Sequence, residues 1–313
     1  MTQPAHWNEL TALDGEALLI RALALSDLTR EQVAERFTED LAIDVAPSGV
    51  DVTSWAFVEA DAQAEAWMCS RETGVLAGAA FLSAGLSSFD DLRVGVLARD
   101  GDMVEPGQPV AKLSGNLRQL LTFERTALNL VTHLSGVASL TAAFVQATAG
   151  THAKVCDTRK TLPGLRRWQK YAVRCGGGTP HRDGLGDAML VKDNHLGGVP
   201  LGDLAATLDN AAVQARSTYP SLKFVEVEVD TLKQLEVVLT TSVDLVLLDN
   251  MSLDQLRDAV AIRDAVSPNI GLEASGGVNL DTVAGIAGTG VDRISVGALT
   301  HSAPSLDLGL DRR

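Results

Sequence analysis

The chain has 313 residues and a formal net charge of −14, with 46% hydrophobic and 21% charged residues. This length predicts one large domain with a smaller one, and the composition is that of a folded globular protein. The acidic excess argues against non-specific binding to nucleic acid, which needs a cationic surface. The sequence has no run of 18 apolar residues, so no membrane span is predicted, and residues 1–10 do not have the pattern of a secretion signal. With three scattered cysteines, these features predict a cytoplasmic protein without a disulfide framework.

The first half of the chain changes from helical to β-like patterns. Residues 10–45 have the apolar spacing of helices, whereas residues 52–113 contain short apolar runs separated by glycine, including 56–58, 66–69 and 94–97. Residues 100–115 resemble a turn of lipoyl or biotinyl carrier domains. No lysine stands at a hairpin tip there, so a structural strand pair is the better interpretation. A long helix is predicted over 117–149, broken or kinked near Ser135 and Gly136.

The second half of the chain alternates predicted strands with predicted helices. Such alternation is typical of parallel strands joined by right-handed crossovers. Six strands in about 150 residues fit a (β/α) barrel, complete or open, and a doubly wound open sheet is the alternative. The strands are predicted over 153–157, 188–191, 224–229, 245–249, 271–274 and 293–296, and the helices over 203–218, 232–239, 253–266 and 280–288.

Basic residues are concentrated between residues 151 and 192, where the local net charge is +6 while the rest of the chain carries −20. One interpretation is a solvated basic helix face. The other is a pocket for small anions, because an acidic chain with a single cationic segment suits a small anionic ligand better than a polymer. The nine basic residues are Lys154, Arg159, Lys160, Arg166, Arg167, Lys170, Arg174, Arg182 and Lys192.

Polar and charged residues follow the predicted strands at the same end of each. In a parallel barrel, ligands bind at the carboxyl ends of the strands, so this recurrence predicts one shared site. The segments concerned are 157–160, 192–195, 249–250, 275–277 and 297–301.

The segment VEVEV (225–229) places Glu226 and Glu228 on one face of a strand and the valines on the other. A buried carboxylate is costly unless it is paired or binds a metal ion. The alternative is an edge strand with one face in water. If the strand lies inside the barrel, Glu228 at its carboxyl end can meet Asp249 across the barrel mouth. Two carboxylates there suit Mg²⁺ or ribose hydroxyls.

Two glycine-containing turns follow the last two predicted strands, at Ser275-Gly276-Gly277 and at Gly297. Glycines let backbone N–H groups approach a phosphate, and helix N-termini favour anions. A separate set of cationic residues would match the carboxylates of a ligand, because arginine binds carboxylates bidentately. A phosphorylated sugar reacting with a small di-acid would fit these features. The cations are Arg159, Lys160, His181, Arg182 and Lys192.

These motifs, in order from about residue 16 to the end of the chain, resemble the quinolinate phosphoribosyltransferase family. The similarity is most specific in the second half. The motifs that carry it are ERTALN (124–129), LSGVA (134–138), DTRKT (157–161) with PGLR (163–166), KYAVR (170–174), HR (181–182), KDNH (192–195), LDN (248–250), EASGG (273–277) and VGALTH (296–301).

The resemblance implies an α/β fold: an open (β/α) barrel over residues 128–301 with an N-terminal α/β sandwich domain over 1–127, to which the tail 302–313 returns. It implies that quinolinate and phosphoribosyl pyrophosphate react, with Mg²⁺, to give nicotinate mononucleotide, pyrophosphate and CO₂ in NAD biosynthesis. It also implies a homodimer in which the N-terminal region of one subunit completes the site of the other, with no nucleic-acid or membrane partner.

The resemblance also assigns roles by motif. The quinolinate carboxylates would be held by a set of cations, of which Arg125 would be donated across the dimer. Lys160 would face phosphoribosyl pyrophosphate or the reacting centre, and Glu228 and Asp249 would hold ribose hydroxyls and Mg²⁺. These three are the expected catalytic residues. The expected carboxylate ligands are Arg125, Arg159, His181, Arg182 and Lys192, and the expected phosphate ligands are Ser275, Gly276, Gly277, Gly297 and His301.

The chain departs from the family pattern at Pro180, where asparagine is usual, at Leu162, where threonine is usual, and at 50–53. Pro180 restricts Thr179 and could change how the loop presents His181. Two other functions stay open from the sequence. One is a related phosphoribosyltransferase for another ring acid, and the other is a non-catalytic carrier or binding module built on 94–115.

Overall fold

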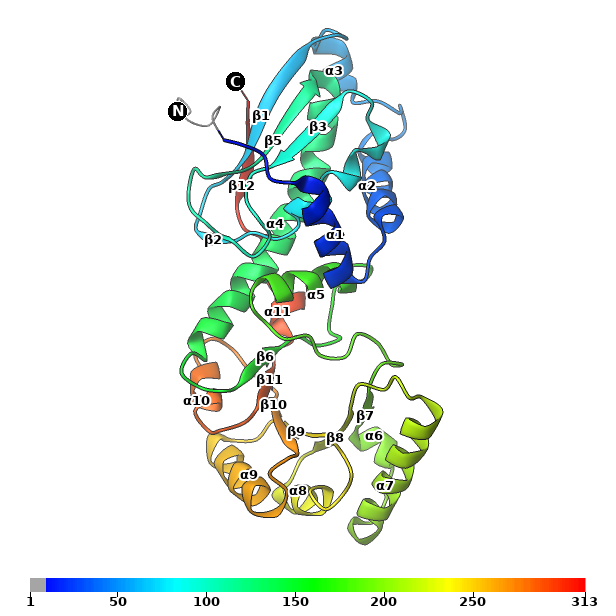
Figure 1. The fold of residues 1–313 in the computed structure, drawn as a ribbon, viewed down its shortest axis with the longest axis vertical. Helices are drawn as coiled ribbons and strands as arrows, with labels where there is room; N and C mark the ends of the chain where they lie inside the picture. Colours follow the sequence, from blue (N-terminus) through cyan, green and yellow to red (C-terminus); the bar gives the residue numbers. More distant parts are fainter. Residues whose placement is uncertain (1–9, 313) are drawn as a thin grey trace. The chain divides into compact units, whose positions relative to one another are not determined.

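The computed structural model of the chain describes residues 10–312 (Figure 1). The absence of a secretion signal was predicted from residues 1–10, and residues 1–9 lie outside the described range. Within it, the chain forms two compact units. The first contains residues up to 142 together with 167–177 and 303–312, and the second contains 143–166 and 178–302. The predicted boundary after residue 127 falls inside the helix α4 (Leu117–Ala147).

The first unit contains an antiparallel sheet of four strands in the order β12-β1-β5-β3. The C-terminal strand pairs with β1, so that Met68 lies opposite Leu310. The indole of Trp67 on β1 is fully buried. Residues 100–115 supply β4 and most of β5, so the interpretation as structural strands is confirmed, but the two do not form one pair: β4 pairs with β2, and β5 pairs with β1 and β3. The strands are β1 (Gln63–Ser70), β3 (Leu92–Val96), β5 (Pro109–Asn116) and β12 (Leu308–Arg312), and β2 (Gly74–Val75) pairs separately with β4 (Met103–Val104).

Helices pack around this sheet within the first unit. The rings of Trp168 and Tyr171 on α5 lie edge-on to Phe81, with centroids 4.9 and 5.0 Å away. The expected β-like run at 56–58 is wrong, because Asp51 accepts hydrogen bonds from the N–H groups of Thr53 and Ser54 and thereby starts a helix. The helices are α1 (Gly15–Ser26), α2 (Arg30–Asp44), α3 (Val52–Phe57), η2 (Ala79–Phe81), η3 (Ala84–Ser88), α4 and α5 (Arg166–Cys175).

Helix α4 is continuous over 31 residues, so the predicted break near Ser135 and Gly136 is wrong. Both residues serve packing instead. The Ser135 hydroxyl accepts a hydrogen bond from the N–H of Ala77 at 2.9 Å, and a Cβ at Gly136 would overlap the carbonyl oxygen of Pro304. By length and composition α4 could cross a membrane, but half of its most apolar window is buried, and a core helix of a soluble protein meets the same criterion.

The second unit contains a six-stranded parallel sheet in the order β6-β11-β10-β9-β8-β7. Neighbours follow the chain from β7 to β11, and β11 then pairs with β6. This is the cyclic order of a barrel opened between β6 and β7, not the reversed order of a doubly wound sheet. All six predicted strands are confirmed to within two residues. They are β6 (Lys154–Cys156), β7 (Met189–Val191), β8 (Val225–Val229), β9 (Leu245–Asp249), β10 (Gly271–Ser275) and β11 (Arg293–Ser295).

The helices between these strands begin at capping residues that the sequence supplies. Ser252 and Gln255 form a capping box at the start of α9, and Thr231 and Gln234 form one at the start of α8. The four predicted helices of this half are confirmed, each to within three residues at either end. The helices of the second unit are α6 (Asp193–Leu196), α7 (Leu201–Thr218), α8 (Leu232–Val238), α9 (Leu253–Val266), α10 (Val283–Ala287) and α11 (Ala298–His301).

Candidate active site

A cavity of about 640 Å³ lies at the carboxyl ends of the parallel strands, and every strand of the sheet or the loop that follows it contributes to its wall. Ten of the predicted site residues line it, so the structure brings them together. They are Arg159, Lys160, His181, Arg182, Lys192, Glu228, Asp249, Ser275, Gly276 and Gly277. The cavity also has lining residues without a predicted site role: Thr158, Leu190, Leu247, Asn250, Glu273 and Ser295.

Two guanidinium groups stand close together in the wall of this cavity. Burial, and next the neighbouring charge of Arg159, lowers the pKa of Arg182. Arg182 is 8% exposed, and its Nη1 donates to the carbonyl oxygen of Ala188 at 3.4 Å. Two cations that line one cavity repel each other, and an anion placed between them removes that repulsion. This side of the cavity is therefore suited to a carboxylate.

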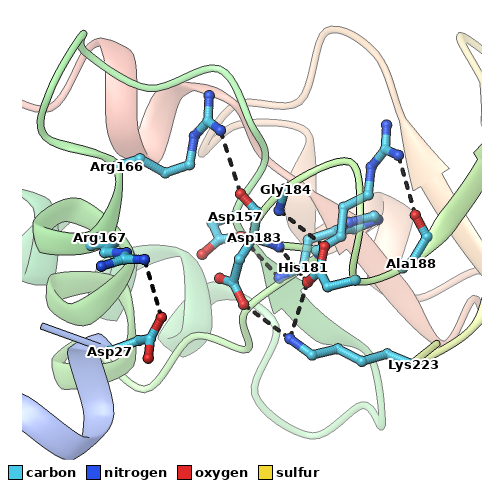
Figure 2. Close-up of polar contacts among 11 residues, drawn as sticks. Asp27, Asp157, Arg166, Arg167, His181, Asp183, Gly184, Ala188 and Lys223 are labelled. Carbon is cyan, nitrogen blue, oxygen red and sulfur yellow. Dashed lines mark hydrogen bonds and ion pairs between the residues drawn. The ribbon is translucent and has the colours of Figure 1, made fainter. Parts of the chain in front are cut away.

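The loop before β7 presents Arg182, and its own hydrogen bonds fix its shape (Figure 2). The N–H of His181 donates to Oδ1 of the buried Asp157 at 2.9 Å. Further along the loop, Asp187 accepts the N–H groups of Asp183 and Gly184 and an ion pair from Lys223. Burial raises the pKa of Asp187, but these three donors outweigh it and lower the pKa to about 2.

Pro180, the departure from the family pattern, fits this loop without disturbing it. Thr179 forms a parallel bridge with Cys156 and so continues the edge of the sheet beside β6. Its N–H donates to the carbonyl of Val155 at 2.8 Å. A residue before proline is restricted to this kind of extended conformation, so Pro180 favours the observed path of the chain. Leu162, the other departure, is 38% exposed.

The acidic side of the cavity contains Glu228 and Asp249. Glu228 forms an ion pair with the ammonium of Lys192, and Oδ2 of Asp249 accepts a hydrogen bond from the amide of Asn250 at 2.7 Å. Strand β8 has neighbours on both edges, β7 and β9, so the alternative of an exposed edge strand is wrong. Carboxylate oxygens are the ligands that Mg²⁺ prefers, and the two groups line one cavity, so this donor set fits the ion.

A buried charged cluster adjoins the cavity, which His181 and Glu273 line, and of its members only His181 was a predicted site residue. Nε2 of His181 lies 3.0 Å from Oε2 of Glu226 and 3.2 Å from Oε1 of Glu273, and both glutamates are fully buried. The second oxygen of Glu273 lies 2.9 Å from Nε of Arg293. The alternation in VEVEV did predict that Glu226 points inward. Its partners come from distant segments, so no local pattern could name them.

The protonation of this cluster follows from its geometry. Burial raises the pKa of Glu226, and so does the charge of Glu273. Burial of His181 lowers the pKa of the ring, but the two glutamates outweigh it and raise the pKa to about 9. The N–H of Arg182 donates to Nδ1 of His181 at 2.7 Å, which requires a lone pair on that nitrogen. The two glutamates therefore favour a proton on Nε2, whereas the N–H of Arg182 opposes a second proton on Nδ1.

The glycine turn after β10 is shaped by its surroundings. Gly276 has φ +98°, and a Cβ there would overlap Oδ1 of Asn250. Gly277 has φ +61° with open space beside it. Both conformations favour glycine and leave backbone N–H groups accessible to a ligand such as phosphate.

Gly297 and His301 are outside the residues that line the cavity, although both lie beside Lys160. A Cβ at Gly297 would lie 3.1 Å from Nε2 of His301 and 3.3 Å from Cδ of Lys160. The hydroxyl of Thr300 donates to the carbonyl of Lys160 at 2.7 Å. Arg125 belongs to the first unit, where it is exposed on α4.

Two family models match this chain: the N-terminal domain of quinolinate phosphoribosyl transferase over residues 51–135 and its C-terminal domain over residues 137–311. The chain belongs to the quinolinate phosphoribosyltransferase family. A carboxylating nicotinate-nucleotide pyrophosphorylase of Mycobacterium leprae is 45% identical over 91% of this chain and 97% of its own length. The rat protein of the same name is 38% identical over 84% and 85%.

Solved structures of this family have the same fold. The nicotinate-nucleotide pyrophosphorylase of Francisella tularensis superposes with a TM-score of 0.82 at 36% identity, covering 92% of this chain and 99% of its own. A family member from Streptococcus pyogenes gives a TM-score of 0.81 at 39% identity, over 91% and 99%. The similarity therefore extends over both units. The α/β class, with a parallel-stranded unit and a separate antiparallel sheet, is confirmed.

Proposed function

We propose that this chain transfers the phosphoribosyl group of phosphoribosyl pyrophosphate to quinolinate and releases pyrophosphate and CO₂, which yields nicotinate mononucleotide for NAD biosynthesis. The observation that carries the proposal is that Arg159 and Arg182 line the same cavity as the carboxylates of Glu228 and Asp249. An acid substrate and a phosphorylated sugar need these opposite environments side by side.

The cationic wall binds the di-acid. Arg159 and Arg182 contact its carboxylates, and Lys192 adds an ammonium to the same cavity. These three cations, together with Arg125 of a partner subunit, would exceed the need of a single carboxylate. This excess favours quinolinate over a mono-acid such as nicotinate.

The acidic side and the glycine turn hold the phosphorylated sugar. Glu228 and Asp249 would bind the ribose hydroxyls and Mg²⁺, and the N–H groups at Gly276 and Gly277 would bind phosphate. When bound, the metal ion offsets the negative charge of the leaving pyrophosphate. Lys160 lines the cavity and can stabilise the same charge.

The chemistry follows from this placement. The pyridine nitrogen attacks the anomeric carbon as the bond from that carbon to pyrophosphate breaks, and alignment of the two reactants supplies much of the rate. The alkylated ring nitrogen is cationic, so it stabilises the electron pair left on the adjacent carbon when its carboxylate leaves as CO₂. A proton from solvent then takes that position, and no organic cofactor is required.

The proposal includes a cytoplasmic homodimer. Arg125 is exposed on α4, where it is available to a second copy of the chain. In this assembly, Arg125 would reach the quinolinate site of the partner subunit and complete its cationic wall.

The deciding experiment mixes the protein with phosphoribosyl pyrophosphate, Mg²⁺ and quinolinate labelled at the 2-carboxylate, and follows labelled CO₂ together with nicotinate mononucleotide. We expect the two products in equal amounts, and none when phosphoribosyl pyrophosphate is omitted. Nicotinate in place of quinolinate is the matched control for a phosphoribosyltransferase of another ring acid. A folded protein that consumes nicotinate and ignores quinolinate would contradict the proposal.

A further inference from the structure

We propose that Glu226, Glu273 and Arg293 are positioning residues for the acid substrate. They hold the ring of His181, and through that ring they hold the backbone of Arg182. This inference rests on the proposed function, because it assigns to these residues a role in binding quinolinate that acts through His181 and Arg182.

The imidazole ring of His181 is held in place by two buried glutamates. Nε2 of His181 faces both glutamates, at 3.0 and 3.2 Å, and Glu273 is held in turn by Nε of Arg293 at 2.9 Å. The edge of the Phe224 ring also packs against the imidazole, with centroids 5.4 Å apart and an interplanar angle of 87°. With both glutamates at 0% exposure, no water competes for these contacts.

The fixed ring of His181 in turn holds the backbone of Arg182. Nδ1 of His181 accepts the N–H of Arg182 at 2.7 Å, and the N–H of His181 donates to Asp157 at 2.9 Å. The peptides before and after His181 are thus each fixed by one hydrogen bond. Because the peptide that leads into Arg182 is held by the ring, the position of the Arg182 guanidinium in the cavity wall depends on that ring.

This arrangement gives His181 a different part from the one that the family resemblance implies. Both ring nitrogens have partners within the protein at hydrogen-bond distance, so binding a substrate carboxylate would cost the ring one of them. Its main contribution is then to place Arg182. Glu228, by contrast, faces the cavity from the same strand and pairs with Lys192.

A metal ion is the competing occupant, because the ligand atoms of His181, Glu226 and Glu273 lie within 4.8 Å of one another. The guanidinium of Arg293 already pairs with one of the two carboxylates. A divalent cation would have to approach this fixed positive charge, so the cluster favours an internal ion pair over a metal site.

The test compares Glu273→Gln with Glu236→Gln, a change of the same chemistry on the exposed face of α8. We expect Glu273→Gln to raise the KM for quinolinate at least ten-fold while the KM for phosphoribosyl pyrophosphate changes less than two-fold. Glu236→Gln should match the unsubstituted protein in both constants. Arg293→Lys, which keeps the charge but loses the planar fork, serves as a second variant if Glu273→Gln does not fold.

A double-mutant cycle decides whether the effect passes through the ring and Arg182. Glu273→Gln should raise the quinolinate KM little further in a His181→Gln or Arg182→Ala background, because the path is already broken. Full additivity of the effects would overturn the proposal, and so would an unchanged quinolinate KM. Stoichiometric metal that is present in the purified protein and lost in Glu273→Gln would also overturn it. Failure of the unsubstituted protein to use quinolinate would instead contradict the proposed function.

Discussion

Arg159 is the residue whose loss should most directly weaken binding of the acid. It lines the cavity beside Arg182, and in the proposed complex its guanidinium forms two hydrogen bonds to a carboxylate. Hydrogen bonds to charged groups contribute about 1.5–3 kcal/mol. A loss of this size corresponds to a decrease in kcat/KM of roughly 10- to 150-fold. We therefore expect Arg159→Ala to lower kcat/KM for quinolinate by this factor, through a higher KM and slower turnover. Arg257→Ala on the exposed face of α9 is the control, and near-normal kinetics of Arg159→Ala would reject the assignment.

Gly276 and Gly277 are adjacent glycines that should respond differently to alanine. A Cβ at position 276 would overlap the side chain of Asn250 in a backbone conformation with φ +98°. At position 277 the space is open, and the penalty is the left-handed conformation alone, about 1–2 kcal/mol. Gly276→Ala should lower the urea midpoint more than Gly277→Ala and raise the KM for phosphoribosyl pyrophosphate further. Equal effects would contradict this account of the turn.

At this scale the sequence predicts residue types better than residue pairs. Alternation placed Glu226 and Glu228 on the inward face, and the cavity and the buried cluster agree with that face. The contact of Glu226 with His181 joins segments 45 positions apart, and Glu273 comes from a third segment. Such a pairing depends on how the strands are ordered around the barrel, which no local pattern contains.

Among the elements, the parallel strands were predictable because each is a short apolar run, and two of the helices that follow them, α8 and α9, begin at capping boxes. The segment 245–249 and the helix at 253–266 agree with the prediction to the residue, and Ser252 caps that helix. Errors arose where tertiary contacts override local signals. Ser135 and Gly136 look like a helix break, yet they are contact points for Ala77 and Pro304 inside one continuous helix.

Gly136 therefore provides a test of how the C-terminal segment packs on α4 in the first unit. In an unobstructed helix, Gly→Ala stabilises by roughly 0.5–1 kcal/mol. At position 136 the new methyl would overlap the backbone of Pro304, and overpacking costs about 1–3 kcal/mol. We expect Gly136→Ala to lower the free energy of unfolding in urea. Gly15 is the first residue of α1, where the mid-helix gain does not apply, and nothing lies near its Cβ, so Gly15→Ala should change this free energy by less than about 0.5 kcal/mol. A stabilising Gly136→Ala would contradict the close approach of Pro304 to Gly136.

For the whole molecule, the preference for a ligand depends more on where the charges lie than on the net charge. The chain carries −14 overall, yet the segment from 151 to 192 carries +6 and supplies most of the cationic wall. The acidic remainder disfavours polyanions, while the cavity remains attractive to small ones. Because the wall and the carboxylates of Glu228 and Asp249 come from the same parallel sheet, one fold holds two substrates of different chemistry in a single cavity.

The proposed homodimer can be tested by combining two impaired variants, each of which lacks one of the two arginines. If Arg125 acts in the partner's site and Arg159 in its own, a dimer of one Arg125→Ala chain and one Arg159→Ala chain has one site with both changes and one intact site. Random pairing in a two-fold dimer makes half of the dimers mixed, so co-expression should restore about a quarter of the normal activity. Each variant alone, and the two purified without subunit exchange, are the controls. Differential tags would show whether mixed dimers form. If they form and co-expression still gives no more activity than the separate variants, Arg125 acts in its own subunit's site or in neither.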